Sequence, residues 1–128
     1  MKLTVLGASG GTGQQLARQA IAAGHEVTAI VRRPESIPAP GPQLRVVRGD
    51  LLDPQWTGEG IDGAEAVLSA LGATERGPTT LSLTGHARTA IGKPLPGGRV
   101  VSRADLAAAV LAAIGDRTTV RQAVAIAR

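Results

Sequence analysis

Three glycines stand at every third position near the start of the chain, and their spacing points directly to phosphate chemistry. Gly7, Gly10 and Gly13 follow an aliphatic run and precede a stretch with helical periodicity. A dinucleotide pyrophosphate binds against backbone N–H groups at a helix N-terminus, where a Cβ would block the turn or the ligand. The alternative is a glycine-rich turn that binds nothing. The residues assigned to the predicted phosphate-binding loop are Gly7, Ser9, Gly10, Gly11, Thr12 and Gly13.

Two arginines follow the second aliphatic run and indicate the type of dinucleotide. Arg32 and Arg33 stand where an NAD site usually carries Asp or Glu for the ribose 2′-hydroxyl. A guanidinium pairs with a 2′-phosphate and is poorly matched to a diol. The pair therefore predicts NADP (NADPH) rather than NAD, the alternative being two solvated arginines at a strand end.

The elements that must position these residues alternate between strand and helix. The periodicity predicts a helix over 10–23 and another after Asp53-Pro54, where Asp53 is the expected N-cap. We therefore expect an α/β fold, a shortened Rossmann-like parallel sheet flanked by helices, in the strand order 3-2-1-4 plus a C-terminal strand. The expected strands cover residues 2–6, 27–31, 44–47, 66–71 and, at the end of the chain, 120–127.

The second half of the chain carries fewer signals. Residues 72–98 are rich in Gly, Pro and Thr and show little apolar periodicity. Ser102 and Asp105 then form a motif similar to a capping box, and Gly115 is the expected end of the helix that it opens. We expect one domain over 1–128, with a nucleotide-binding core to residue 82 and a C-terminal loop, helix and strand from residue 83.

Composition excludes several classes of function. With 128 residues, 43% of them hydrophobic, the chain is long enough for one core, in which Trp56 is the only aromatic residue. The absence of cysteine excludes disulfides and zinc–thiolate sites, and no metal site is predicted. The net charge of +4 comes from scattered arginines without a basic stripe, which argues against nucleic-acid binding. No apolar stretch is long enough for a signal or membrane span, so a cytoplasmic protein is expected.

The chain resembles the atypical short-chain dehydrogenase/reductase group, that is, NmrA-like NAD(P)-binding proteins and reductases of the biliverdin/flavin type. The resemblance lies in residues 1–82, through the segments 7–13, 25–34 and 47–53, and again from Pro94 to the final strand. It implies that Asp50 and Leu51 flank the adenine, and that Arg32 and Arg33 hold the 2′-phosphate. The residues that the resemblance places beside the cofactor, at the end of the fourth strand, are Ser69, Ala70, Leu71 and Gly72.

Proton donors are few, and the family's catalytic segment has no counterpart. The chain has no Tyr, and it passes from about residue 82 to the segment that usually follows the sixth strand. His25 begins a strand at the edge away from the ligand, so His86 is the one weak catalytic candidate. Reduction of a flavin, quinone or similar acceptor by NADPH needs mainly proximity and remains chemically possible. The alternative is a non-catalytic module that senses NADP or binds a partner.

The shortening also leaves the fourth strand at a sheet edge. Residues 66–71 are apolar on both faces and carry neither charge nor proline. Either the C-terminal strand pairs with this edge or a second copy does, and we expect a homodimer.

Overall fold

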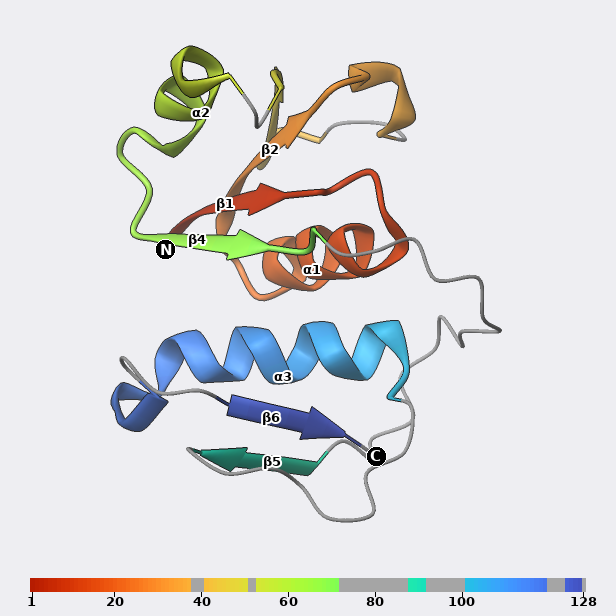
Figure 1. The fold of residues 1–128 in the computed structure, drawn as a ribbon, viewed down its shortest axis with the longest axis vertical. Coiled ribbons are helices and arrows are strands. Elements are labelled where there is room, and N and C mark those ends of the chain that lie inside the picture. Colours follow the sequence, from red (N-terminus) through yellow and green to blue (C-terminus); the bar gives the residue numbers. More distant parts are fainter. Residues whose placement is uncertain (38–40, 51–52, 72–87, 92–100, 120–123, 128) are drawn as a thin grey trace. The chain divides into compact units, whose positions relative to one another are not determined.

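The computed structural model describes residues 1–37, 41–50, 53–71, 88–91, 101–119 and 124–127. The chain divides into two compact units, Met1–Glu75 and Arg76–Arg128 (Figure 1). The expectation that the whole chain is one domain with a core ending at residue 82 stays a prediction.

The first unit is built on a four-stranded parallel sheet. Its strands are β1 (Lys2–Leu6), β2 (Glu26–Val31), β3 (Leu44–Arg48) and β4 (Ala66–Ser69). They lie in the order β3-β2-β1-β4, which confirms the predicted order and the Rossmann-like fold class. Because all four strands are parallel, their carboxyl ends meet at one edge, where open α/β sheets bind ligands.

The strand register assigns alternate residues to opposite faces of the sheet. Val5 pairs with Ala29 on the face covered by α1 (Gly11–Ala22). Thr4 lies on the other face, where its hydroxyl donates a 2.7 Å hydrogen bond to the Gly60 carbonyl of α2 (Pro54–Ile61). Figure 1 accordingly shows α1 and α2 on opposite sides of the sheet. The core between these layers is aliphatic, and its largest fully buried side chains are those of Leu3, Val5, Leu16, Val27 and Ile30, together with Thr4.

The helix boundaries follow from local chemistry, as the sequence predicts. Gly24 takes φ +87° just after α1, a conformation that favours glycine and stops the helix. Asp53 caps α2 by accepting the Gln55 N–H at 3.0 Å, and Pro54 occupies the first turn. The proline-rich stretch after β2 holds a single turn of 3₁₀ helix, η1 (Pro34–Ser36), which contacts β3.

The second unit contains α3 (Arg103–Gly115), the 3₁₀ turn η2 (Arg117–Thr119) and two short strands. The strands β5 (Arg88–Ile91) and β6 (Val124–Ala127) pair antiparallel in a sheet of their own. The predicted C-terminal strand is thus present, but it does not extend the parallel sheet or pair with β4. Its partner β5 lies in the stretch where we predicted no regular element.

The fourth strand is shorter than predicted and lies at the edge of its sheet among the described residues. It ends at Ser69 rather than at Leu71, and the Ala70 N–H makes the last hydrogen bond to β1, 2.9 Å from the Leu6 carbonyl. Val67 and Leu71 keep 41% and 56% of their surface exposed, so β4 and its continuation present apolar side chains to solvent.

Candidate functional site

The loop between β1 and α1 brings a helix N-terminus to the carboxyl edge of the sheet. Gly10 is the N-cap of α1, with no side-chain cap hydrogen bond, and the first turn contains no acidic residue. The N–H groups of a first helical turn lack partners within the helix and lie at its positive end. The start of α1 therefore offers amide donors to an anion and supplies no negative charge of its own.

Two of the three glycines are required by the fold itself. Gly7 has φ +76°, which L side chains rarely adopt, and its carbonyl accepts the Gly10 N–H at 3.0 Å. Gly13 is buried where α1 packs on the loop, and a Cβ there would lie only 2.7 Å from the Ala8 Cα. These positions explain how the chain turns and how closely the helix approaches the strand.

Gly10 differs from both, because the described fold does not require glycine there. Its φ of −79° and ψ of 160° are open to any residue. A Cβ at Gly10 would meet only the Gly7 carbonyl oxygen, at 3.4 Å, and the residue is exposed. The bare backbone at Gly10 thus leaves the helix N-terminus open to a group from outside the chain, as a pyrophosphate requires.

A crevice of about 260 Å³ begins at this loop and follows the carboxyl edge of the sheet. It passes the end of β2 at Arg32 and reaches Asp50 after β3, while Leu71 lines it beyond β4. The structure therefore brings together predicted site residues from four separate segments. The described residues that line the crevice are Gly7, Ser9, Ile30, Val31, Arg32, Gly49, Asp50 and Leu71.

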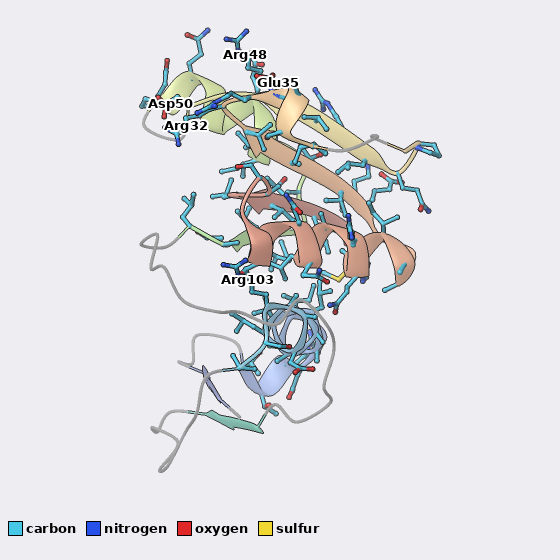
Figure 2. The ribbon with its side chains drawn as sticks, turned by 90° about the vertical axis from the view of Figure 1, so that its right-hand side faces the viewer. Arg32, Glu35, Arg48, Asp50 and Arg103 are labelled. Atoms are coloured by element: carbon cyan, nitrogen blue, oxygen red, sulfur yellow. The ribbon has the colours of Figure 1, made fainter. Side chains whose placement is uncertain are left out.

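A second hollow, of about 320 Å³, adjoins the crevice and shares Arg32, Gly49 and Asp50 with it. The additional lining residue is Arg48, the last residue of β3. Figure 2 shows Arg32, Arg48 and Asp50 gathered at one end of the first unit. Arg48 was not among the predicted site residues; it ends β3, next to the end of β2 that Arg32 follows.

Further predicted residues lie outside the described lining of both hollows. Ala70 lies against the loop, since its backbone would be 3.2 Å from a Cβ on Gly7. Arg33 is exposed and its carbonyl accepts the Ser36 N–H, at 3.0 Å, but it is not among the described lining residues of either hollow. Leu51, Gly72 and His86 lie outside the described residues.

The opposite edge of the sheet has a hollow of similar size but different chemistry. About 260 Å³ is lined there by residues that include two bases, Lys2 and Arg45, and two acids, Glu26 and Asp62. This hollow lies at the amino ends of the strands, away from the start of α1. Volume alone therefore does not distinguish the two edges, whereas the exposed helix N-terminus does.

The described residues contain neither a candidate metal site nor a candidate membrane helix. No group of three His, Asp or Glu side chains in those parts of the chain is placed to hold a metal ion. None of the helices described there is long and apolar enough to cross a membrane. The predicted cytoplasmic location stays a prediction.

A glycine loop, a helix N-terminus and a crevice at the carboxyl edge of a parallel sheet define a Rossmann-type dinucleotide-binding unit. A family model described as NAD(P)H-binding matches residues 7–92, and the chain belongs to this family. The predicted resemblance to NAD(P)-binding proteins of the atypical short-chain dehydrogenase/reductase type is thereby confirmed. Placement within the NmrA-like branch stays a prediction.

Two relatives each match somewhat more than half of this chain. The uncharacterised protein YwnB of Bacillus subtilis is 36% identical over 73 residues, which are 57% of this chain and 32% of that protein. A solved structure from Bacteroides thetaiotaomicron, named as a candidate epimerase, is 39% identical with a TM-score of 0.52, over 56% of this chain and 33% of that one. The chain spans about a third of the length of each of these relatives.

A third structure matches over nearly the whole chain. It is a Rossmann-fold NAD(P)-binding family protein from Shigella flexneri, with a TM-score of 0.77 over 99% of this chain and 93% of that one. At 14% identity the match supports the fold and does not extend to function.

Proposed function

We propose that this chain binds NADP(H) in the crevice at the carboxyl edge of its sheet and serves the reduction of a flavin, quinone or similar acceptor. The observation that carries the cofactor assignment is the surface at Gly10, where an uncapped helix N-terminus meets a backbone without a side chain. The pyrophosphate would lie against the first-turn amides of α1.

The residues along the crevice fit the rest of a dinucleotide. Arg32 stands one residue beyond β2, within reach of a ribose 2′-substituent, and its guanidinium suits a phosphate better than a diol. Asp50 follows β3 at the position that the family resemblance assigns to the adenine. Leu71 presents an apolar wall at the β4 side.

The proposed reaction makes modest demands on the protein. NADPH supplies the hydride when bound, and the acceptor takes that hydride and one proton from water, leaving NADP⁺. Residues of this chain would hold and orient the cofactor, which is the main requirement for such a transfer. The absence of Tyr anywhere in the sequence favours a second candidate, a module that binds NADP(H) without turnover.

Substitution of Gly10 tests the cofactor site. We expect Gly10→Val to keep its melting temperature near that of the wild type, because the backbone there allows any residue, and to bind NADPH too weakly to detect by fluorescence titration. Gly41→Val is the matched control, since Gly41 is also exposed and a Cβ there meets nothing within 4 Å. Wild-type affinity in a folded Gly10→Val protein would overturn the proposal.

Two further measurements separate the finer assignments. Arg32→Ala should weaken binding of NADPH much more than binding of NADH, and an equal loss for both would refute the 2′-phosphate assignment. Oxidation of NADPH in the presence of riboflavin or menadione separates a reductase from a module that only binds the cofactor.

We also propose that two copies pair through the outer edge of β4. This strand has a neighbour on one side only among the described residues, lacks charge and proline, and exposes Val67. Sedimentation should give a dimer for the wild type and a monomer for Val67→Lys, which places a charge on the edge strand. A wild-type monomer of 12.9 kDa would refute this pairing.

A further inference from the structure

We infer that Arg48, at the end of β3, is the second cation of the 2′-phosphate site, and that with Arg32 it makes the crevice selective for NADPH. The inference rests on the proposed NADP(H) function and adds a residue that neither the glycine pattern nor the pair Arg32-Arg33 indicates. It also assigns Arg33 a lesser part than the sequence suggests.

The pairing of β2 with β3 fixes where Arg48 lies. Val31 and Arg48 are register partners, and the Gly49 N–H donates a 3.0 Å hydrogen bond to the Val31 carbonyl. Arg32, the next residue after Val31, therefore stands one position along from Arg48 on the adjacent strand. Arg48 is the last residue of β3 and Arg32 follows the last residue of β2, so the two arginines lie at the same edge of the sheet.

Both arginines line the hollow of about 320 Å³ that adjoins the crevice. Its other described lining residues are Gly49 and Asp50, so the hollow opens from the part of the site where the adenosine half of a dinucleotide would lie. Arg33 is not among them. Its carbonyl accepts both the Ser36 N–H, at 3.0 Å, and the Ser36 hydroxyl, at 2.6 Å, in the turn of η1 that leads away from β2.

The charges at this hollow suit a phosphate. Arg32 and Arg48 are both exposed, and guanidinium groups bind phosphate with parallel, charge-assisted hydrogen bonds. Asp50 lines the same hollow, so two positive charges stand there against one carboxylate, and the excess of positive charge favours an added anion. Glu35 adds a negative charge in η1, which contacts β3.

Calorimetric titration with NADPH and with NADH tests the inference. Arg48→Ala should weaken NADPH binding about tenfold and leave NADH binding unchanged, because only NADPH carries the 2′-phosphate. Arg33→Ala is the matched control, an exposed arginine beside the same site, and should change NADPH affinity less than about threefold. Glu35→Gln should strengthen NADPH binding about two- to threefold by removing an opposing charge.

The outcomes separate this inference from the proposed function. A wild-type protein that binds neither cofactor, or binds both equally, refutes the NADP(H) assignment and the role of Arg48 with it. A wild type that prefers NADPH while Arg48→Ala keeps the full preference overturns the role of Arg48 alone. Arg48→Gln provides an independent test, since it retains side-chain length without the charge and should lose the preference as Arg48→Ala does.

Discussion

The first turns of α1 and α3 both contain backbone N–H groups that have no partner within the helix, and the two helices treat these groups differently. Ser102 caps α3, where its hydroxyl oxygen accepts the Asp105 N–H at 3.0 Å and its hydroxyl donates to the Asp105 carboxylate at 2.7 Å. Both residues are buried, and the carboxylate lies in the first turn, at the positive end of the helix. By contrast, α1 begins at Gly10 with no side-chain cap and no acid in its first turn.

The difference shows that the N–H groups at a helix start can be satisfied by side chains of the same chain or left without such partners. In α3 the chain itself supplies the negative charge, through Asp105, and the hydrogen-bond acceptor, through Ser102. The start of α3 therefore needs no anion from outside the chain. In α1 a close packing contact at Gly13 positions the helix instead, and the donors stay available.

The largest expected effect comes from breaking the packing contact that positions α1. Gly13→Ala places a Cβ against the backbone of Gly7 and Ala8, which cannot move as a flexible side chain could. We expect unfolding in urea to show a loss of about 3 kcal/mol in the free energy of unfolding. The matched control is Gly58→Ala in α2, where a Cβ meets nothing within 4 Å and helix propensity should add about 0.5–1 kcal/mol. Equal effects of the two substitutions would contradict this account of Gly13.

A smaller effect is expected at the start of α3. Ser102→Ala removes the acceptor for the Asp105 N–H and one donor to a buried carboxylate, so we expect a cost of about 1–2 kcal/mol by thermal or urea unfolding. Ser36→Ala in η1 is the control, because its hydroxyl makes a single exposed hydrogen bond and should matter by less than about 0.5 kcal/mol. Equal losses in the free energy of unfolding for Ser102→Ala and Ser36→Ala would show that the Ser102 cap stabilises α3 no more than an exposed hydrogen bond does.

Much of the first unit could be predicted because its signals are local. Aliphatic runs, Asp53-Pro54 and Gly24 mark strand and helix boundaries through the conformations that single residues allow. The glycine spacing likewise fixes the loop, and the alternation of strand and helix leaves few parallel topologies. The strand order followed from these features.

The parts that were missed depend on contacts between distant residues. The strand β5 has four residues, Arg88–Ile91, without a marked pattern, and its pairing with β6 over a long separation gives no local signal. Arg48 was not predicted for the same reason, since it lines a hollow together with Arg32 only because β2 and β3 are paired. A local pattern predicts where a strand ends, whereas the register decides which side chains meet there.

The smallest effect concerns the other end of α3, where Asp116 follows the helix. Its carboxylate accepts the Thr118 hydroxyl at 2.7 Å and the Thr118 N–H at 2.8 Å, and these bonds lower its pKa from the ordinary value of 3.8. Because the pKa is lowered on folding, the stabilisation is present above the unfolded value and is lost as the pH falls through the folded one.

The stability of the wild type should therefore decrease slightly below about pH 4, and Asp116→Asn should lack that part of the decrease. The effect is small because the carboxylate is fully exposed and solvent screens it. An NMR titration should show the Asp116 pKa below 3.8 in the wild type and closer to that value in Thr118→Ala, which loses the hydroxyl donor. A wild-type pKa at or above 3.8 would show that Asp116, unlike the carboxylate at the start of α3, gains nothing from its hydrogen bonds.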